Sequence, residues 1–223
     1  MHIKTSNQQK LDLGFYGYSC NWGVHIAGLY ETEKERDEII FGFLGTGALS
    51  GDLQLYAVAE RTRENFKVEF SEKWPEAGKM LGDSSVFQLS TPKELYYPDG
   101  VFSPIAMDEG LENFYKESQE NGIINVRATA EMVWALEAIP GRELLMVYES
   151  RLNYFIPGKP WISICLYNVT KFPGATIMNV LRTHPYTINR GVLMGNPYYQ
   201  DPDIWLKENA PEYLPENIHK LKQ

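Results

Sequence analysis

Short apolar runs recur along the chain, separated by longer segments in which apolar and polar residues mix. Runs of this length that are apolar almost throughout are typical of strands buried on both faces of a sheet. Two of the shortest runs are joined by a tight turn at Arg190-Gly191, which predicts a hairpin near the C-terminus. In chain order, the predicted strands are residues 22–30, 53–59, 86–89, 124–128, 161–168, 186–189 and 191–194.

The segments between these runs predict helices. After residue 30, an acidic first turn precedes apolar residues at helical spacing, and the glycines of GTGALSG (residues 45–51) end the predicted helix. Residues 90–104 contain three prolines and predict a long loop, which in a compact domain is often functional. Further helices are predicted over residues 61–80, 105–120, 142–155 and 173–185.

Strands that alternate with helices predict an α/β domain of three layers, with a mostly parallel central sheet and helices on both faces. In such sheets, ligands bind beyond the carboxyl ends of the strands. Because no linker divides the chain, we expect one domain over residues 15–199. A flexible N-terminus (residues 1–14) precedes it, and a polar C-terminal tail (residues 200–223) follows it.

The charge balance excludes one class of partner. The chain has 21 Lys and Arg against 29 Asp and Glu, a net charge of −8, so we expect no direct binding to nucleic acid. No apolar stretch is long enough to span a membrane, and the N-terminal MHIKTSNQQK lacks the apolar core of a signal peptide. We therefore expect a cytoplasmic protein in which Cys20 and Cys165 are free thiols.

Motifs for catalysis and cofactor binding are not found. A phosphate-binding loop requires G-x-x-x-x-G-K-[ST] after a strand, but ETEKER follows the first strand, and its carboxylates would repel a triphosphate. Cys20 and His25 are five residues apart, and neither Cys165 nor His184 has a second ligand at the spacing of a zinc site. The nucleophile elbow G-x-S-x-G does not occur. The sequence thus predicts no enzyme, no catalytic residue, no metal and no cofactor.

Charged residues that lie close to apolar sequence are candidates for a functional site. Arg127 lies at the end of the fourth predicted strand, Glu131 follows it, and Glu149 and Arg151 lie in an apolar helix. Such groups either form structural ion pairs or supply the polar end of an apolar pocket. The chain is also rich in aromatic residues, with 14 Tyr, 10 Phe and 5 Trp. These side chains either pack in the core or line a pocket for an apolar guest.

Several segments, in order and with matching spacing, resemble the MEDS family, the methanogen/methylotroph DcmR-type sensory domain. The resemblance covers about residues 15–199, and R-x-T-x-E-M-x-W-A-L and L-R-T-H-P are its specific motifs. The matching stretches are HIAGLYET (25–32), FLGTGALSGDLQLYAVAE (43–60), GVFSPIAMDEGLENFYKESQENGIINVRATAEMVWAL (100–136), YESRLNYF (148–155), ISICLYNVTKFPGATIMNVLRTHPYTI (162–188) and GVLMGNPYY (191–199).

The resemblance implies a sensory input module. In the family, the domain is joined to histidine kinases or to DNA-binding regulators and is proposed to bind small hydrocarbon-type or one-carbon compounds. It also implies a RecA/KaiC-type core without a P-loop, a sheet order of 3-2-4-5-1-6, and Glu131 near the metal-binding acid of those ATPases. No kinase or helix-turn-helix segment follows residue 199, so the chain is expected to signal through such a partner or to be an excised domain. A homodimer is compatible with these expectations.

Residues and resemblance together predict a domain that binds a small, largely apolar or one-carbon compound. Trp134 and the tyrosines would supply apolar walls, while Arg127 and Glu131, close together at the carboxyl end of the sheet, would orient a polar group of the guest. Two other functions stay open: a degenerate nucleotide-binding protein or hydrolase with Glu131 as base, and a module that binds only proteins. The predicted pocket residues are His25, Tyr30, Arg127, Glu131, Trp134, Tyr148, Glu149, Arg151, Tyr167 and His184.

Overall fold

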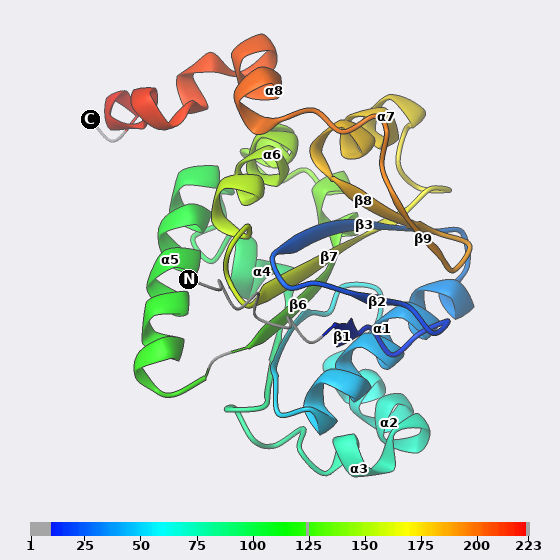
Figure 1. The fold of residues 1–223 in the computed structure, drawn as a ribbon. Coiled ribbons are helices and arrows are strands. Elements are labelled where there is room, and N and C mark those ends of the chain that lie inside the picture. The colour runs from blue at the N-terminus through cyan, green and yellow to red at the C-terminus, as the bar shows by residue number, and fades with distance from the viewer. Residues whose placement is uncertain (1–9, 124, 222–223) are drawn as a thin grey trace, which may run out of the picture.

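A seven-stranded sheet forms the centre of the computed structural model, which describes residues 10–123 and 125–221 (Figure 1). The strand order is β5-β4-β6-β7-β3-β8-β9, and neighbours are parallel except for the β8–β9 hairpin. The predicted order 3-2-4-5-1-6 and the α/β fold class are confirmed, with β9 added at one edge. The strands are β3 (Val24–Tyr30), β4 (Leu53–Ala57), β5 (Phe87–Ser90), β6 (Val126–Glu131), β7 (Trp161–Asn168), β8 (Tyr186–Asn189) and β9 (Val192–Gly195).

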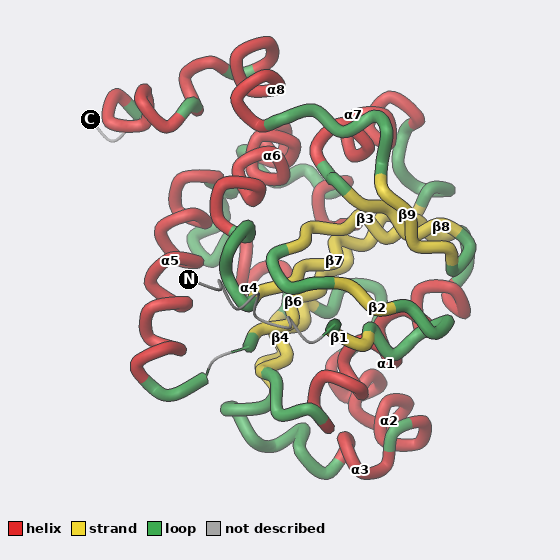
Figure 2. The backbone as a smooth tube through the Cα atoms, viewed as in Figure 1, coloured by secondary structure: helices red, strands yellow, loops and turns green. Residues whose placement is uncertain are grey.

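Helices cover both faces of the sheet, because its central strands are apolar on both sides (Figures 1 and 2). In β7, Ile162 and Ile164 belong to one hydrophobic core, whereas Cys165 and Tyr167 belong to the other. We name the two sides the α1 face and the α6 face. The α1 face carries α1 (Glu33–Leu49), α2 (Arg63–Lys73) and α3 (Pro75–Gly78), and the α6 face carries α4 (Pro92–Tyr96), α5 (Pro104–Glu120), α6 (Leu145–Phe155) and α7 (Gly174–Thr183).

Both ends of the described chain pack against the domain. The short strands β1 (Leu11–Asp12) and β2 (Ser19–Cys20) pair with each other, and Leu11 is buried, whereas residues 1–9 of the predicted flexible N-terminus lie outside the described residues. In the predicted polar tail, α8 (Pro202–Asn209) buries Trp205 and Leu206 in a small core with Val147 of α6. Within the described residues, four 3-10 helices complete the elements: η1 (Met132–Leu136), η2 (Arg142–Leu144), η3 (Pro211–Tyr213) and η4 (Pro215–Lys220).

Close packing and capping correct two helix predictions. Gly45 lies inside α1 rather than at its end, and a Cβ there would lie 2.3 Å from the ring of Trp74, so the glycine permits close approach. The predicted loop 90–104 contains α4, because Thr91 and Glu94 form a capping box at its start. In residues 10–123 and 125–221, no helix is both long and apolar enough to cross a bilayer.

The fourth strand is displaced from its predicted place. β6 runs from Val126 to Glu131 instead of ending at residue 128, because Thr129 and Ala130 continue the pairing with β4 and β7. Residue 124, where the prediction began, lies outside the described residues. The shift puts Arg127 near the start of the strand and Glu131 at its end.

Candidate functional site

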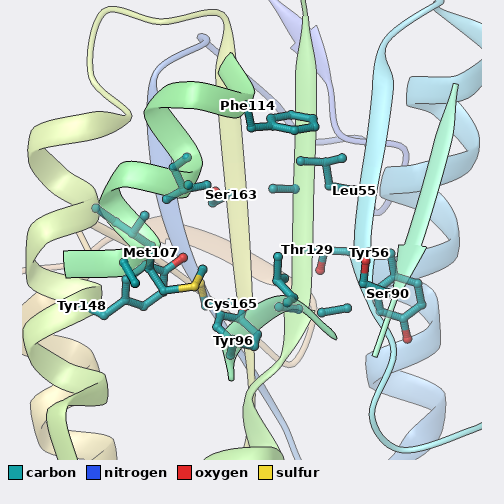
Figure 3. Close-up of a pocket in the computed structure, with 18 of the residues that line it drawn as sticks. Leu55, Tyr56, Ser90, Tyr96, Met107, Phe114, Thr129, Tyr148, Ser163 and Cys165 are labelled. Atoms are coloured by element: carbon teal, nitrogen blue, oxygen red, sulfur yellow. The ribbon is translucent and has the colours of Figure 1, made fainter. Parts of the chain in front are cut away.

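A cavity of about 440 Å³ lies between the α6 face of the sheet and the helices α4, α5 and α6 (Figure 3). This volume lies in the range of small-molecule sites, about 300–1,000 Å³. Of the ten predicted pocket residues, Tyr148 is the one that lines it. Most of the wall is apolar and includes Leu55, Ala57, Met107, Leu111, Phe114, Ala128, Ala130 and Leu152.

Small side chains on neighbouring strands create this space. In the pairing of β4 with β6, Leu55 lies beside Ala128, and Ala57 lies beside Ala130. All four residues line the cavity, as does Gly110 of α5. Because alanine and glycine do not fill the gap between sheet and helices, apolar surface stays uncovered inside the domain, where a core would otherwise be close-packed.

A few polar atoms lie in the apolar wall. Tyr96, Tyr148 and Cys165 lie close together, and the Cys165 sulfur is part of the lining (Figure 3). Burial raises the pKa of Tyr96 and of Tyr148 well above the usual value, so both phenols keep their proton. The cavity therefore offers a largely apolar volume whose wall includes hydroxyl and thiol groups.

Next to Cys165, four side chains from four elements converge: His25 of β3, Glu149 of α6, Cys165 of β7 and His184 after α7. Glu149 Oε2 lies 3.1 Å from His25 Nε2 and 3.3 Å from His184 Nε2. Cys165 Sγ lies 3.5 Å from His25 Nε2. One ligand atom from each residue lies within 4.8 Å of all the others, and each residue is buried. We call these residues the His-Glu-Cys cluster.

Hydrogen bonds fix the orientation of both imidazoles in this cluster. His184 Nδ1 lies 2.8 Å from the backbone carbonyl oxygen of Val180, to which it donates. His25 Nδ1 lies 3.3 Å from Asn153 Oδ1, and the Asn153 amide nitrogen donates to three backbone carbonyls, which leaves its oxygen as the acceptor. Both Nδ1 atoms thus carry a proton, and a neutral ring presents its Nε2 lone pair to Glu149.

Burial also sets the charges of the cluster. Burial and the neighbouring His184 lower the pKa of His25 to about 4, so His25 is neutral at pH 7. Burial and the neighbouring Glu149 raise the pKa of the Cys165 thiol. Tyr167 donates to Glu149 Oε1 over 2.6 Å and holds the carboxylate in place. The structure thus brings together four predicted pocket residues (His25, Glu149, Tyr167 and His184), beside the cavity rather than in its wall.

Tyr30 and Glu131 lie on the opposite side of the sheet, at the carboxyl ends of β3 and β6 on the α1 face. Glu131 Oε2 accepts hydrogen bonds from the backbone N–H groups of Ala59 and Glu60, at 2.5 and 2.6 Å, and Oε1 lies 3.4 Å from Arg36 Nε. Tyr30 donates to Glu60, which also pairs with Arg36. The resemblance puts Glu131 near the metal-binding acid of the ATPases. In this structure its carboxylate oxygens instead accept hydrogen bonds from groups of the chain itself.

In the turn between β3 and α1, the backbone amides likewise form hydrogen bonds within the chain. β3 ends at Tyr30, and α1 begins at Glu33. The backbone N–H groups of Glu31 and Thr32 donate to Glu35 Oε2 at 2.8 and 3.0 Å. An anion bound at this helix N-terminus would need the same N–H groups. A side-chain carboxylate therefore takes the place that a phosphate group has in a nucleotide-binding loop.

We expect isothermal titration calorimetry with Mg-ATP to show no heat of binding. The carboxylates of this turn repel a triphosphate, and Glu35 already accepts from its amides. Inorganic phosphate at the same concentration is the control for dilution heat. A micromolar dissociation constant that weakens in Glu31→Ala would show that the turn binds nucleotide after all.

The prediction that Arg127 and Glu131 lie together is wrong. The two residues stand near opposite ends of β6, because the strand continues beyond its predicted end. Arg127 Nε pairs with Asp52 over 2.8 Å, and Nη1 donates to the backbone carbonyls of Asp12 and Phe43. Arg127 therefore ties the N-terminal segment to the sheet and has no part in the cavity.

Arg151 and Trp134 also lie outside the cavity wall. Arg151 pairs with Asp108 of α5 and donates to the backbone carbonyl of Tyr213, so it joins α6 to α5 and to the C-terminal segment. Trp134 is 1% exposed and stacks on Tyr96, with ring centroids 4.8 Å apart. It thus supports a cavity residue from behind.

The sequence prediction missed most of the cavity wall and Cys165. Small residues on the same face of neighbouring strands, Ala57, Ala128 and Ala130, are the signal that could have indicated the cavity. Spacing rules for metal sites could not indicate the His-Glu-Cys cluster, because its members lie on separate elements.

Comparison with known proteins agrees with this description. Transcriptional repressor DcmR of Methylorubrum extorquens is 23% identical over 172 residues, 77% of this chain and 62% of that protein, so the chain spans less than two thirds of the relative's length. The fold is similar to KaiC-like protein PH0186 of Pyrococcus horikoshii, with a TM-score of 0.55, 11% identity and coverage of 80% of this chain and 79% of that one. Flagellar accessory protein FlaH of Methanocaldococcus jannaschii gives a TM-score of 0.51, 14% identity and coverage of 77% and 75%.

The family model named MEthanogen/methylotroph, DcmR Sensory domain matches residues 24–185. This range contains five of the seven sheet strands (β3 to β7), the residues that line the cavity and the His-Glu-Cys cluster. The match therefore covers both the fold and the candidate sites, and the chain belongs to the MEDS family of sensory domains.

Proposed function

We propose that this domain senses a small, largely apolar compound in the cavity on the α6 face and passes a conformational signal to a regulatory partner. The observation that carries the proposal is the cavity itself, a largely apolar space between strands and helices with a few polar groups in its wall. Sites for small molecules have this character, because the apolar wall supplies affinity and the few polar groups orient the guest.

The volume indicates the size of the guest. A water molecule, with one heavy atom, takes up about 30 Å³ in the liquid, so a one-carbon compound of two or three heavy atoms fills roughly 60–90 Å³. The cavity, at about 440 Å³, is several times larger. At about 30 Å³ per heavy atom, it has room for up to about 15 heavy atoms, so it favours a larger apolar guest over a single one-carbon molecule.

The helices around the cavity supply a route for the signal. α4, α5 and α6 form the wall opposite the sheet, and α6 carries α8 through the small core of Val147, Trp205 and Leu206. A guest that changes the distance between sheet and helices would shift α6 and the C-terminal segment together. The likeness to a transcriptional repressor supports a transcription regulator as the output, with a histidine kinase as the alternative partner.

Ala130→Leu should abolish binding of apolar probes. The added carbons enter the empty space beside β6, so the variant is expected to fold while its cavity is filled. Thermal melts with cyclohexane, toluene and naphthalene should raise the Tm of the wild type, whereas methanol should not. The same probes should leave the Tm of Ala130→Leu unchanged.

Ala175→Leu is the matched control, because it makes the same change at an exposed position of α7. It should keep the probe-induced increase in Tm. Equal responses in Ala130→Leu and wild type would show that the probes bind elsewhere. A wild type whose Tm responds to none of the probes would count against an apolar guest.

Two observations favour this function over its alternatives. A module that binds only proteins has no use for an apolar cavity inside the domain. A hydrolase with Glu131 as base needs a free carboxylate, but Glu131 accepts hydrogen bonds from two backbone N–H groups.

A further inference from the structure

The His-Glu-Cys cluster brings three acceptor atoms together, with the Cys165 thiol beside them. Glu149 Oε2 and His184 Nε2 are buried, and neither has a hydrogen-bond partner within the described part of the chain. His25 Nε2 also faces Glu149 Oε2, and the Nδ1 atoms of both rings are engaged on the far side. Buried polar atoms in native proteins are almost always satisfied, so these converging acceptors require either an added proton or a metal cation between them.

We propose that His25, Glu149, Cys165 and His184 bind one zinc ion. Zinc prefers four ligands in a tetrahedron, with nitrogen and oxygen at about 2.0–2.2 Å and sulfur at about 2.3 Å, which gives edges of roughly 3.3–3.8 Å between ligand atoms. Three of the distances in the cluster, 3.1, 3.3 and 3.5 Å, are close to such edges, and all its ligand atoms lie within 4.8 Å of one another. A zinc ion therefore fits with small movements of the four side chains.

The charges of the cluster match a divalent cation. Glu149 carries one negative charge, and the Cys165 thiol loses its proton to solvent when it binds zinc, which gives a second. Two anionic ligands and two neutral imidazoles neutralise Zn²⁺, so the bound site carries no net charge. That balance suits a fully buried position, where an uncompensated charge is costly.

The surroundings have the features of a metal site. Zinc-bound imidazoles usually donate their second N–H to a carbonyl or amide oxygen, which fixes the ring. His184 does so to Val180, and His25 to Asn153. Tyr167 donates to the second oxygen of Glu149 and leaves Oε2 for the metal. The neighbouring cavity, which Cys165 also lines, gives the ion a way in.

A proton shared between Glu149 and one histidine is the alternative. A proton on His184 Nε2 would bond Glu149 Oε2 over 3.3 Å, and the Cys165 thiol would then donate to His25 Nε2 over 3.5 Å. The 3.1 Å contact between His25 Nε2 and Glu149 Oε2 would stay a contact between two acceptors. The two possibilities differ in metal content and in spectroscopic signature, neither of which depends on the guest proposed for the cavity.

The experiment is to purify the full chain, remove metal with a chelator and titrate with zinc chloride and, separately, with cobalt chloride. We expect one zinc per chain and a Tm that rises with zinc concentration. Cobalt should give the thiolate charge-transfer band and the intense d–d bands of tetrahedral coordination with sulfur. Absence of stoichiometric zinc uptake by the folded wild type would overturn the proposal.

Two variants and one control identify the ligands. Cys165→Ser should remove the thiolate band, and Glu149→Gln, which keeps the shape of the side chain, should weaken zinc binding at least about tenfold. Cys20→Ser is the matched control, because Cys20 is the second free cysteine and lies outside the cluster. It should keep both the band and the stoichiometry. Loss of the band in Cys20→Ser, with retention in Cys165→Ser, would overturn the assignment.

Discussion

Arg127→Met is expected to lower the free energy of unfolding by about 3–5 kcal/mol, because Asp52 would be left as an unpaired buried charge. Arg127 is 0% exposed and Asp52 is 1% exposed, and their side chains pair over 2.8 Å. The substitution also removes the hydrogen bonds to the carbonyls of Asp12 and Phe43. For a chain of this length, a loss of this size corresponds to a Tm lowered by roughly 6–20 °C. Urea unfolding and calorimetry measure it.

A double variant separates the ion pair from the packing around it. Asp52→Asn combined with Arg127→Met removes both charges, so it should cost less than the sum of the two single substitutions. Lys79→Met is the control, because it breaks the exposed Lys79–Glu76 pair and should change stability little. Similar losses in Arg127→Met and Lys79→Met would contradict a structural role for the buried pair.

Trp134→Ala should cost about 3–5 kcal/mol of stability, the range for removing a large aromatic residue from a core. Trp134 stacks on Tyr96 and lies 5.0 Å, centroid to centroid, from Phe102. Because it packs behind the cavity wall, the probe-induced increase in Tm should stay near that of the wild type. Thermal melts of the variant with and without toluene test both parts.

Trp134→Phe keeps most of the ring contacts and should lose much less stability, which makes it the matched comparison. A small stability loss in Trp134→Ala together with loss of the toluene response would return Trp134 to the cavity wall, as the sequence prediction had it. A large loss with an intact response would establish it as a core residue.

The strands were predictable where their apolar character is continuous. β7 has the predicted bounds, 161–168, because every residue in it is buried and most are apolar. The end of β6 was not predictable in this way, since Ala128, Thr129 and Ala130 carry little hydrophobic signal and are held in the sheet by pairing on both sides. The same alanines line the cavity, so the misplaced strand end and the missed cavity wall have one cause.

The predicted pocket residues lie on both faces of the sheet, because a residue at the end of a strand can point to either face. His25, Glu149, Tyr167 and His184 meet on the α6 face, as a pocket hypothesis requires. Tyr30 and Glu131 lie at strand ends as well, but on the α1 face, where Tyr30 donates to Glu60 and Glu131 accepts from the backbone N–H of Ala59. Periodicity of two assigns a face only when the register is known. Arg127 was misplaced because β6 continues to Glu131, beyond its predicted end at residue 128.

Cys165 belongs to the cavity wall and to the His-Glu-Cys cluster, so its sulfur is one atom shared by two binding equilibria. Such equilibria obey reciprocity: the factor by which zinc changes the affinity for a guest must equal the factor by which the guest changes the affinity for zinc. A guest that draws the sulfur into the cavity would release metal, and a guest that presses it back would retain metal. Metal supply and guest concentration would then act on the same equilibrium of the domain. A zinc titration with and without the guest, and a guest titration with and without zinc, have to give the same ratio of dissociation constants.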